Sequence, residues 1–273
     1  MKSETSAHLS DHGKPVVRIG AVSYLNTKPL VYGLDQLLPE AEIVYDLPSR
    51  LADQLSTGQL DVALIPSIEY LLNPDYTIIS DACIACRGPV YSVQLISRKP
   101  IEEIKTLALD EGSRTSVAMV QILLSQRFNR IPQLEPFPIG SHISELSSDA
   151  VLVIGDRAMH LSNDDFCEVW DLGEEWCRWS ALPFVFAMWV ARASFSEHFT
   201  QVQSALSTAR DQGVKQLAEI ARQESAHVQL SQSQCHDYLQ NNLHFCLGPE
   251  EQQGLELFFD HAQKLELLPG HTF

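Results

Sequence analysis

Apolar runs and helical patterns alternate along the first part of the chain. The apolar runs are short, rich in β-branched residues, and cover residues 16–22, 41–47 and 61–65. Between them, residues 28–38 and 48–60 place leucines at helical spacing, and Pro29 stands near the start of the first pattern. Short apolar runs predict buried strands, and leucines on one face predict amphipathic helices. The alternation predicts a βαβαβ unit, in which crossover helices join parallel strands.

The pattern changes beyond this unit and then starts again. Residues 76–100 are rich in strand formers and are broken by Gly88 and Pro89, which predicts two strands. After Lys99 the alternation resumes, with strands predicted over residues 106–110, 150–156 and 182–192 and a helix over 117–128. From Ser194 onward the pattern is mostly helical, with helices predicted over roughly 197–210, 213–223, 231–241 and 250–266.

We therefore expect an α/β protein with two lobes around a central cleft. The first lobe is expected to hold residues 15–98 and 190–273, including the C-terminal helices, and the second lobe residues 99–189. The strands over residues 90–97 and 184–192 are well placed to run between the lobes. Residues 1–14 are expected to form a disordered tail. Clefts at the carboxyl ends of strands are where such folds bind ligands.

Small polar residues follow the ends of four predicted strands. Because the carboxyl ends of parallel strands gather on one edge of a sheet, we expect these residues to line the cleft. Hydroxyls, an amide and one carboxylate suit hydrogen bonding to a small, oxygen-rich ligand. The predicted ligand-binding residues are Ser23, Tyr24, Asn26, Ser67, Ser113, Thr115, Ser116 and Asp156.

Each of these loops also has a purely structural interpretation. Ser113, Thr115 or Ser116 can cap the helix that follows, or the free N–H groups there can attract a carboxylate or phosphate. The spacing excludes a phosphate-binding P-loop. Asp156 can cap a helix, accept a hydrogen bond from a ligand, or transfer a proton. Ser92, which lies in a strand after a Gly-Pro turn, is by itself most typical of a structural serine.

Charge and composition narrow the class of partner. The formal net charge of -16 argues against nucleic acids and anionic membrane surfaces, since both are bound by clustered Lys and Arg. Residues 1–15 contain no apolar core of the kind found in secretory signals, and no apolar run is long enough for a membrane span. We therefore expect a cytoplasmic protein that binds a small molecule.

Cysteine and histidine residues point to no metal, redox or nucleotide cofactor. The six cysteines are expected to be free thiols in a cytoplasmic chain. Cys83 and Cys86 have C-x-x-C spacing, but no second pair follows at the distance of a zinc site, so their role stays open. The ten histidines avoid the predicted cleft loops, and no Ser-His-Asp, H-E-x-x-H or G-x-G-x-x-G arrangement is present.

Six blocks of sequence resemble one enzyme family. They are RIGAVSYLNTKPL, GQLDVALIPSIEYL, RGPVYSVQLISRKP, GSRTSVAMVQILL, VLVIGDRAM and DLGEEWCRWSALPFVFAMWVAR, in that order. Together they resemble the chorismate dehydratases, the first enzymes of the futalosine route to menaquinone. The resemblance covers about residues 16–195, and the helical C-terminal region is compatible with it.

The resemblance implies a fold, a reaction and two site residues. The fold is that of the periplasmic-binding proteins, type II, here without a transport role. The reaction is a hydro-lyase step, in which chorismate loses water to give 3-[(1-carboxyvinyl)oxy]benzoate, without a cofactor or metal. The family's motifs place Asn26 and Ser92 at its catalytic positions, and both residues match.

Two rival functions share this fold. The first is the sister enzyme of the same route, which releases 1,4-dihydroxy-6-naphthoate, although SYLNTKPL and RGPVYSV favour the dehydratase. The second is a non-catalytic protein or sensor that binds a small carboxylate. A secreted member of that class would carry a signal peptide, which this sequence does not show. The oligomeric state stays open, and the helical C-terminal region is compatible with a dimer contact.

The base of the predicted reaction has two candidates. No histidine stands in the matching motifs, so the enolpyruvyl carboxylate of the substrate is one candidate for taking the ring proton. Asn26 and Ser92 would then orient that carboxylate and stabilise developing charge. Asp156 is the competing candidate.

Overall fold

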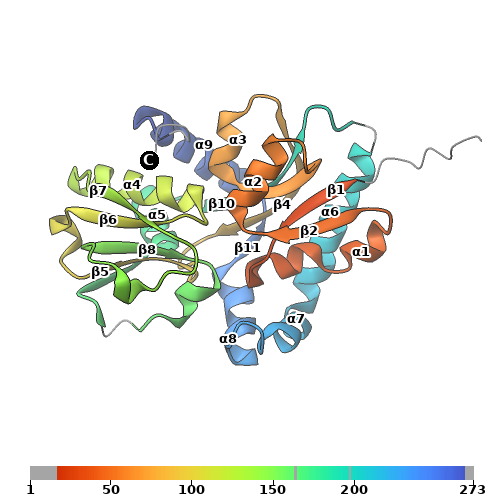
Figure 1. Cartoon of the computed structure of the whole chain (residues 1–273). Helices are drawn as coiled ribbons and strands as arrows, with labels where there is room; N and C mark the ends of the chain where they lie inside the picture. The colour runs from red at the N-terminus through yellow and green to blue at the C-terminus, as the bar shows by residue number, and fades with distance from the viewer. Residues whose placement is uncertain (1–16, 163–164, 197, 268–273) are drawn as a thin grey trace, which may run out of the picture.

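Two β-sheets lie side by side in the protein, each covered by helices (Figure 1). The computed structural model describes residues 17–162, 165–196 and 198–267, and the predicted tail over residues 1–14 lies outside them. The first sheet has the strand order β11-β4-β10-β3-β1-β2. Its strands are β1 (Arg18–Val22), β2 (Glu42–Asp46), β3 (Val62–Pro66), β4 (Tyr76–Cys86), β10 (Phe184–Arg192) and β11 (His244–Cys246).

The predicted βαβαβ unit is present in the first sheet. Strand β1 pairs in parallel with β2 and with β3, and every residue of β3 is buried. Helix α2 (Pro48–Ser56) crosses from β2 to β3 and buries Leu51 and Leu55 on one face. Helix α3 (Ser67–Leu72) follows β3 directly. The carboxyl ends of β1 and β3 therefore lie on the same edge, as the alternation predicts.

The predicted helix over residues 28–38 is wrong. A 3-10 helix, η1 (Leu25–Val31), contains Pro29, and a separate short helix, α1 (Leu34–Leu37), follows it. Gly33 separates the two with a φ of +68°, in the left-handed region that favours glycine. A proline inside the segment and a left-handed residue after it interrupt the helix, although the leucine spacing suits one.

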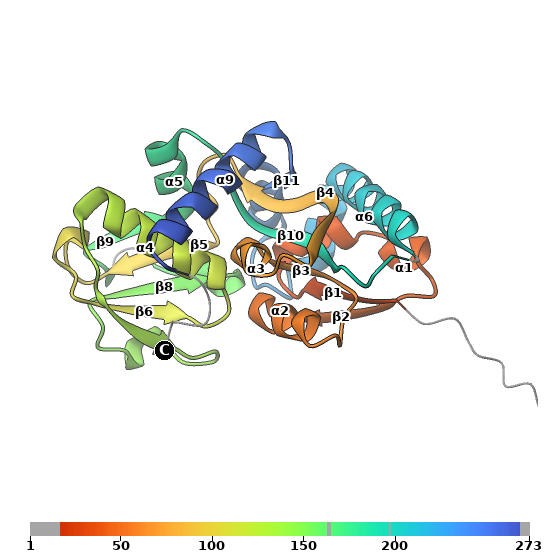
Figure 2. The ribbon, with the colours of Figure 1, turned by 90° about the horizontal axis from the view of Figure 1, so that it is seen from above.

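The second sheet has the strand order β7-β6-β8-β5-β9. Its strands are β5 (Val93–Ser97), β6 (Thr106–Asp110), β7 (Gln133–Phe137), β8 (Ala150–Ile154) and β9 (Glu168–Asp171). Strand β6 pairs in parallel with β7 and β8, whereas β5 pairs antiparallel with β8 and β9. Helices α4 (Arg114–Phe128) and α5 (Leu172–Ser180) contact each other beside this sheet (Figure 2).

The chain passes between the two sheets through loops, and the strands next to those loops each belong to one sheet. The predicted boundary at residue 98 places β5 in the first lobe, but β5 pairs within the second sheet. Strand β10 pairs along its length with β3 and β4 of the first sheet, so the return to that lobe comes before residue 184. The passages between sheets therefore lie at residues 87–92 and 181–183.

The C-terminal region is helical, as predicted. It comprises α6 (Phe199–Gly213), α7 (Leu217–Glu224), α8 (Gln232–Asp237) and α9 (Pro249–Lys264). The third helix differs from the prediction, because a π-helical turn, η7 (Tyr238–Asn242), replaces its last part. Helix α6 packs on η1 and β4 of the first lobe, whereas α9 contacts β10 and also α4 of the second lobe.

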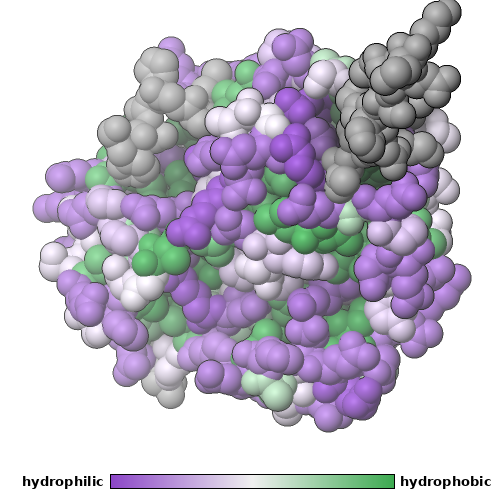
Figure 3. Space-filling view, turned by 45° about the vertical axis from the view of Figure 1, so that its right-hand side comes forward, coloured by the Kyte–Doolittle hydropathy of each residue, from purple (hydrophilic) through white to green (hydrophobic). Residues whose placement is uncertain are grey.

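The surface seen from one side is mostly hydrophilic (Figure 3). Hydrophilic residues dominate the face in Figure 3, and hydrophobic residues gather only in small separate areas. No helix among the described residues is long and apolar enough to cross a membrane.

All six cysteines are free thiols, as predicted, and Cys83 and Cys86 are buried in β4.

Candidate active site

A cavity lies where the two lobes meet. Its empty space amounts to about 490 Å³, part of which is open to solvent. The first lobe contributes Tyr24 and Asn26, and the second contributes Ser92, Ser113 and Ser116. Apolar side chains complete the walls, among them Val22, Ile84, Val93, Ile154 and Phe186. None of the lining residues carries a charged side chain.

Asn26 reaches the cavity from η1, directly after the first strand. Its side-chain oxygen accepts a hydrogen bond from the Thr27 hydroxyl at 3.3 Å. Thr27 is fully buried, so this contact holds one end of the amide against the protein. The amide nitrogen is then the donor that Asn26 can turn to another group. The polar cluster after β1 thus supplies one wall of the cavity.

Ser92 lies at the end of the first passage between the sheets, between the Gly-Pro turn and β5. Its hydroxyl oxygen accepts a hydrogen bond from the Tyr238 phenol at 2.9 Å. Its backbone is held as well, because the Ser92 carbonyl oxygen accepts from the Gly155 amide at 2.9 Å. Sequence reasoning missed Tyr238, since a tyrosine in a helical C-terminal pattern is typical of a core residue.

The residue before Ser92 has a strained backbone. Tyr91 has a φ of +64°, and the Ser92 amide donates to the Val90 carbonyl oxygen at 2.7 Å, which closes a γ-turn around Tyr91. The Asp171 carboxylate accepts from the Val90 amide at 2.9 Å and from the Tyr91 amide at 2.6 Å. Burial raises the pKa of Asp171, and these backbone contacts lower it. Such strain concentrates at functional sites, and here Asp171 holds it beside Ser92.

Ser113 and Ser116 lie at the start of α4. Ser113 is the N-cap residue, and its hydroxyl accepts from the Ser116 amide at 3.3 Å, which confirms the predicted cap. The Ser113 hydroxyl also donates to the Ser116 hydroxyl oxygen at 2.9 Å. The Ser116 proton is thereby left to another acceptor, and both side chains line the cavity. Capping and cavity lining are therefore combined in one motif.

Tyr24 crosses from the first lobe to the second. Its ring lies flat against Gly155, where a Cβ atom would come within 2.8 Å of it. Gly155 has a φ of +71°, so both the close approach and the backbone favour glycine. Burial and the nearby Asp110 raise the pKa of Tyr24, so its phenol stays neutral. Asp110 itself is paired with Arg157.

The other predicted residues lie outside the cavity lining. Ser23 is exposed, and its backbone amide donates to the Asp46 carbonyl oxygen at 3.1 Å. Ser67 and Thr115 are fully buried behind the wall, where the Ser67 hydroxyl donates to the Val185 carbonyl oxygen at 2.7 Å. Thr115 accepts from the Ile68 amide at 3.2 Å. These contacts join α3, α4 and β10.

Asp156 also lies outside the lining, at the start of the 3-10 helix η4 (Asp156–His160), which follows β8. Its carboxylate accepts from the Leu25 amide at 3.2 Å, which ties the second lobe to the first. Burial is the largest effect on this group and raises its pKa, whereas His160 and Lys28 lower it. The carboxylate therefore has a structural contact between lobes.

The described residues offer no metal site. No group of three or more His, Cys, Asp or Glu among them is arranged to hold an ion. Cys83 and Cys86 pack in different apolar clusters, and burial raises the pKa of both thiols well above the ordinary value. Buried, protonated thiols are poor metal ligands and poor nucleophiles.

Solved structures similar to this chain have the periplasmic-binding-protein fold. AF1704 from Archaeoglobus fulgidus matches with a TM-score of 0.72 at 17% identity, over 94% of this chain and 100% of that one. The periplasmic aliphatic sulphonate binding protein SsuA from Escherichia coli matches with a TM-score of 0.62 at 15% identity, over 94% of each chain. A Candida albicans protein described with the generic periplasmic binding protein fold has a TM-score of 0.58 at 11% identity, over 93% of this chain and 96% of that one. The predicted fold is therefore confirmed.

Sequence comparison is more specific. A curated chorismate dehydratase from Thermus thermophilus is 30% identical over 257 residues, which cover 88% of this chain and 93% of that protein. The sequence model described as menaquinone biosynthesis matches residues 17–264. The match spans both lobes, the cavity and the helical C-terminal region, so the chain belongs to the menaquinone-biosynthesis family.

Proposed function

We propose that this protein is a chorismate dehydratase, a hydro-lyase that removes water from chorismate to give 3-[(1-carboxyvinyl)oxy]benzoate. The observation that carries the proposal is that Asn26 and Ser92 line one cavity, in a chain 30% identical to a protein of that name. The two residues come from different lobes and are far apart in sequence. If both residues act on one substrate, as the family motifs imply, Asn26 and Ser92 must line the same cavity.

The walls of the cavity suit both halves of chorismate. Val22, Ile84 and Phe186 offer apolar surface to the ring. The two substrate carboxylates need hydrogen-bond donors, and the available ones are the hydroxyls of Ser92 and Ser116 and the amide of Asn26. Helix α4, of 15 residues, also begins at this wall and directs the positive end of its dipole there. Neutral donors would therefore replace a basic pocket.

The reaction draws its driving force from the substrate. Loss of the C4 hydroxyl and of the proton on C3 makes the ring aromatic, and the two fragments leave as water. The protein must hold the enolpyruvyl ether in one orientation, so that this path is followed instead of rearrangement. Asn26 and Ser92 would orient the enolpyruvyl carboxylate and stabilise the charge that develops.

The substrate carboxylate is the base that the site supports best. No Asp, Glu or His lines the cavity, whereas Asp156 is occupied by the Leu25 amide outside it. A general base must come within hydrogen-bond distance of the proton that it removes. In this proposal the carboxylate takes the C3 proton and passes it to the departing C4 hydroxyl, which leaves as water, so no residue of the protein changes its charge.

Ultraviolet absorbance of the purified protein with chorismate tests the proposal. The expected result is loss of the substrate spectrum and growth of an aromatic product whose mass is that of chorismate minus water. Unchanged chorismate with tight binding would instead identify a binding protein. Unchanged chorismate without binding, together with release of 1,4-dihydroxy-6-naphthoate from that route's intermediate, would identify the sister enzyme.

A further inference from the structure

Tyr238 connects the helical C-terminal region to the candidate active site. It is the first residue of the π-helical turn η7, and its side chain is 1% exposed. The phenol donates to the Ser92 hydroxyl oxygen at 2.9 Å, across a sequence separation of 146 residues. The ring packs at a tilt against Tyr91, with 6.2 Å between ring centroids. Tyr238 therefore contacts Ser92 and the strained residue next to it.

The direction of this hydrogen bond determines what Ser92 can do. A serine hydroxyl has one proton to donate and can accept two hydrogen bonds. Because the Ser92 oxygen accepts from Tyr238, its own proton cannot be directed to the same phenol. The Ser92 side chain lines the cavity, so that proton is available to a ligand there. Without Tyr238, the Ser92 hydroxyl would be free to rotate.

The phenol is suited to act as a constant donor. Burial raises the pKa of Tyr238 far above the neutral range, so the group keeps its proton. Side-chain contacts from Ser92 and Asn26 act in the opposite direction, which places the Asn26 side chain close to the same phenol. Asp156 and Asp171 add to the rise. The two candidate catalytic residues thus meet at one tyrosine.

We propose that Tyr238 is a positioning residue of the dehydration, which fixes the Ser92 hydroxyl as a donor to the enolpyruvyl carboxylate of the substrate. This inference rests on the proposed function. Tyr238 acts through Ser92 and needs no contact with the substrate. A hydroxyl that is aimed in advance loses less rotational freedom when it holds the carboxylate in the orientation that the reaction needs.

Tyr238→Phe removes the donor and keeps the ring. The expected result is a decrease in kcat of about tenfold, the size of one well-formed hydrogen bond, while KM changes by less than about threefold. Tyr70→Phe is the matched control, because Tyr70 packs against Phe259, does not line the cavity, and loses the same atom. Thermal unfolding of each variant sets an assay temperature below its transition, so lower stability is not counted as lost kcat.

A double-mutant cycle with Ser92→Ala separates positioning from packing. If Tyr238 acts through Ser92, Tyr238→Phe changes kcat by less than about twofold once Ser92 is alanine. The inference would be overturned if the fold losses of kcat multiply in the double variant, or if Tyr238→Phe keeps the wild-type kcat. The proposed function would stand in either case. A wild-type protein that leaves chorismate unchanged would overturn both, and that result appears before any variant is made.

Discussion

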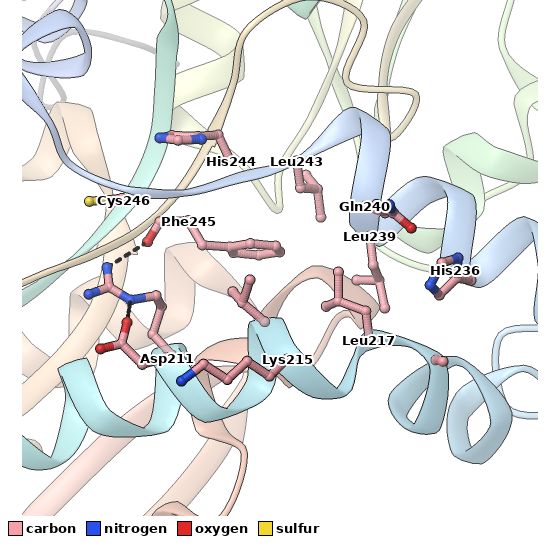
Figure 4. Close-up of a pocket in the computed structure, with 13 residues that line it drawn as sticks. Asp211, Lys215, Leu217, His236, Leu239, Gln240, Leu243, His244, Phe245 and Cys246 are labelled. Carbon is pink, nitrogen blue, oxygen red and sulfur yellow. Dashed lines mark hydrogen bonds and ion pairs between the residues drawn. The ribbon is translucent and has the colours of Figure 1, made fainter.

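The protein has two hollows of very different character. The empty space in the cavity between the lobes is about 490 Å³, and that in a groove on the helical C-terminal side is about 1340 Å³, each including space open to solvent. The groove runs between the helical segment that carries Asp211, at the end of α6, and Lys215, just after it, and the segment that carries Leu239 and Leu243 (Figure 4). Volume alone would favour the groove, but the residues that match the family motifs line the cavity.

The polar groups of the two hollows explain the difference. In the groove, Arg210 is already paired with Asp211 and Asp81 and also donates to the Phe245 carbonyl oxygen. In the cavity, the protons of Ser92 and Ser116 are left for a ligand after their internal contacts are made. Hydroxyl protons that are left for a ligand and converge on one space identify a binding site better than the volume of that space does.

One segment separates the two hollows. Tyr238 faces Ser92 at the cavity, and its neighbours Leu239, Gln240 and Leu243 line the groove. Substitutions on the two sides of this segment should therefore have unequal effects on activity.

The largest expected effect comes from the cavity. Asn26→Ala and Ser92→Ala should each lower kcat about 10²–10³-fold, the usual loss when a donor to developing charge is removed. Gln240→Ala is the control from the groove side, because its side chain is exposed there. Steady-state kinetics with chorismate measures all three. Equal losses in the cavity and groove variants would remove the distinction between the two hollows.

Closing the cavity should have the next largest effect. Gly155→Ala would place a Cβ atom 2.8 Å from the Tyr24 ring at a φ of +71°, so it should lower the free energy of unfolding by about 1–3 kcal/mol and raise KM. Gly140→Ala is the matched control, because its φ is +89° and no atom lies within 4 Å of the added Cβ. Denaturant unfolding and KM measure both. A similar KM in the two variants would show that Tyr24 does not shape the site.

Asp156→Asn should have a small effect on activity. If the substrate carboxylate is the base, kcat should stay within about threefold of wild type, a change below about 1 kcal/mol. The asparagine oxygen can still accept from the Leu25 amide. A loss of about 10²-fold, with Asn26→Ala nearly unaffected, would instead make Asp156 the base.

The same variant should change how stability depends on pH. Burial raises the pKa of Asp156 in the folded protein above the ordinary value of about 3.9. The folded state then holds a proton that the unfolded state has released, so wild-type stability falls as the pH rises through this window. Asparagine does not ionise, so the Tm of Asp156→Asn relative to wild type should rise from about pH 4 toward neutrality. A constant difference in Tm would contradict the buried carboxylate.

The smallest effect is expected at the groove itself. Val214→Asp introduces a charge at a side chain that is 41% exposed and lines the groove. Because Val214 lines the groove and not the cavity, kcat and KM should stay within about twofold of wild type, and Tm should change little. A larger loss of kcat would mean that the groove is coupled to the site through the segment that carries Tyr238.

Local sequence signals predicted the elements and part of the site. The alternation of apolar runs and leucine patterns predicted the parallel strands β1, β2 and β3, and the hydroxyls before Val117 predicted the cap at Ser113. The helix over residues 28–38 failed, because Pro29 and the left-handed Gly33 outweigh leucine spacing. The predicted lobe boundaries near residues 98 and 189 do not match the sheets, because β5 pairs in the second sheet and β10 in the first. Strand pairing joins segments that are distant in sequence, so a local pattern does not predict it.

The sequence by itself determined the α/β class, the two-lobed order and the polar residues at the strand ends, because periodicity and turn residues act over a few neighbours. Tertiary structure decided which of those residues meet. It placed Asn26, Ser92 and Ser116 on one cavity and kept Ser67 and Thr115 behind its wall. It also brought Tyr238 to Ser92, a contact between distant segments that depends on packing and that no local pattern encodes.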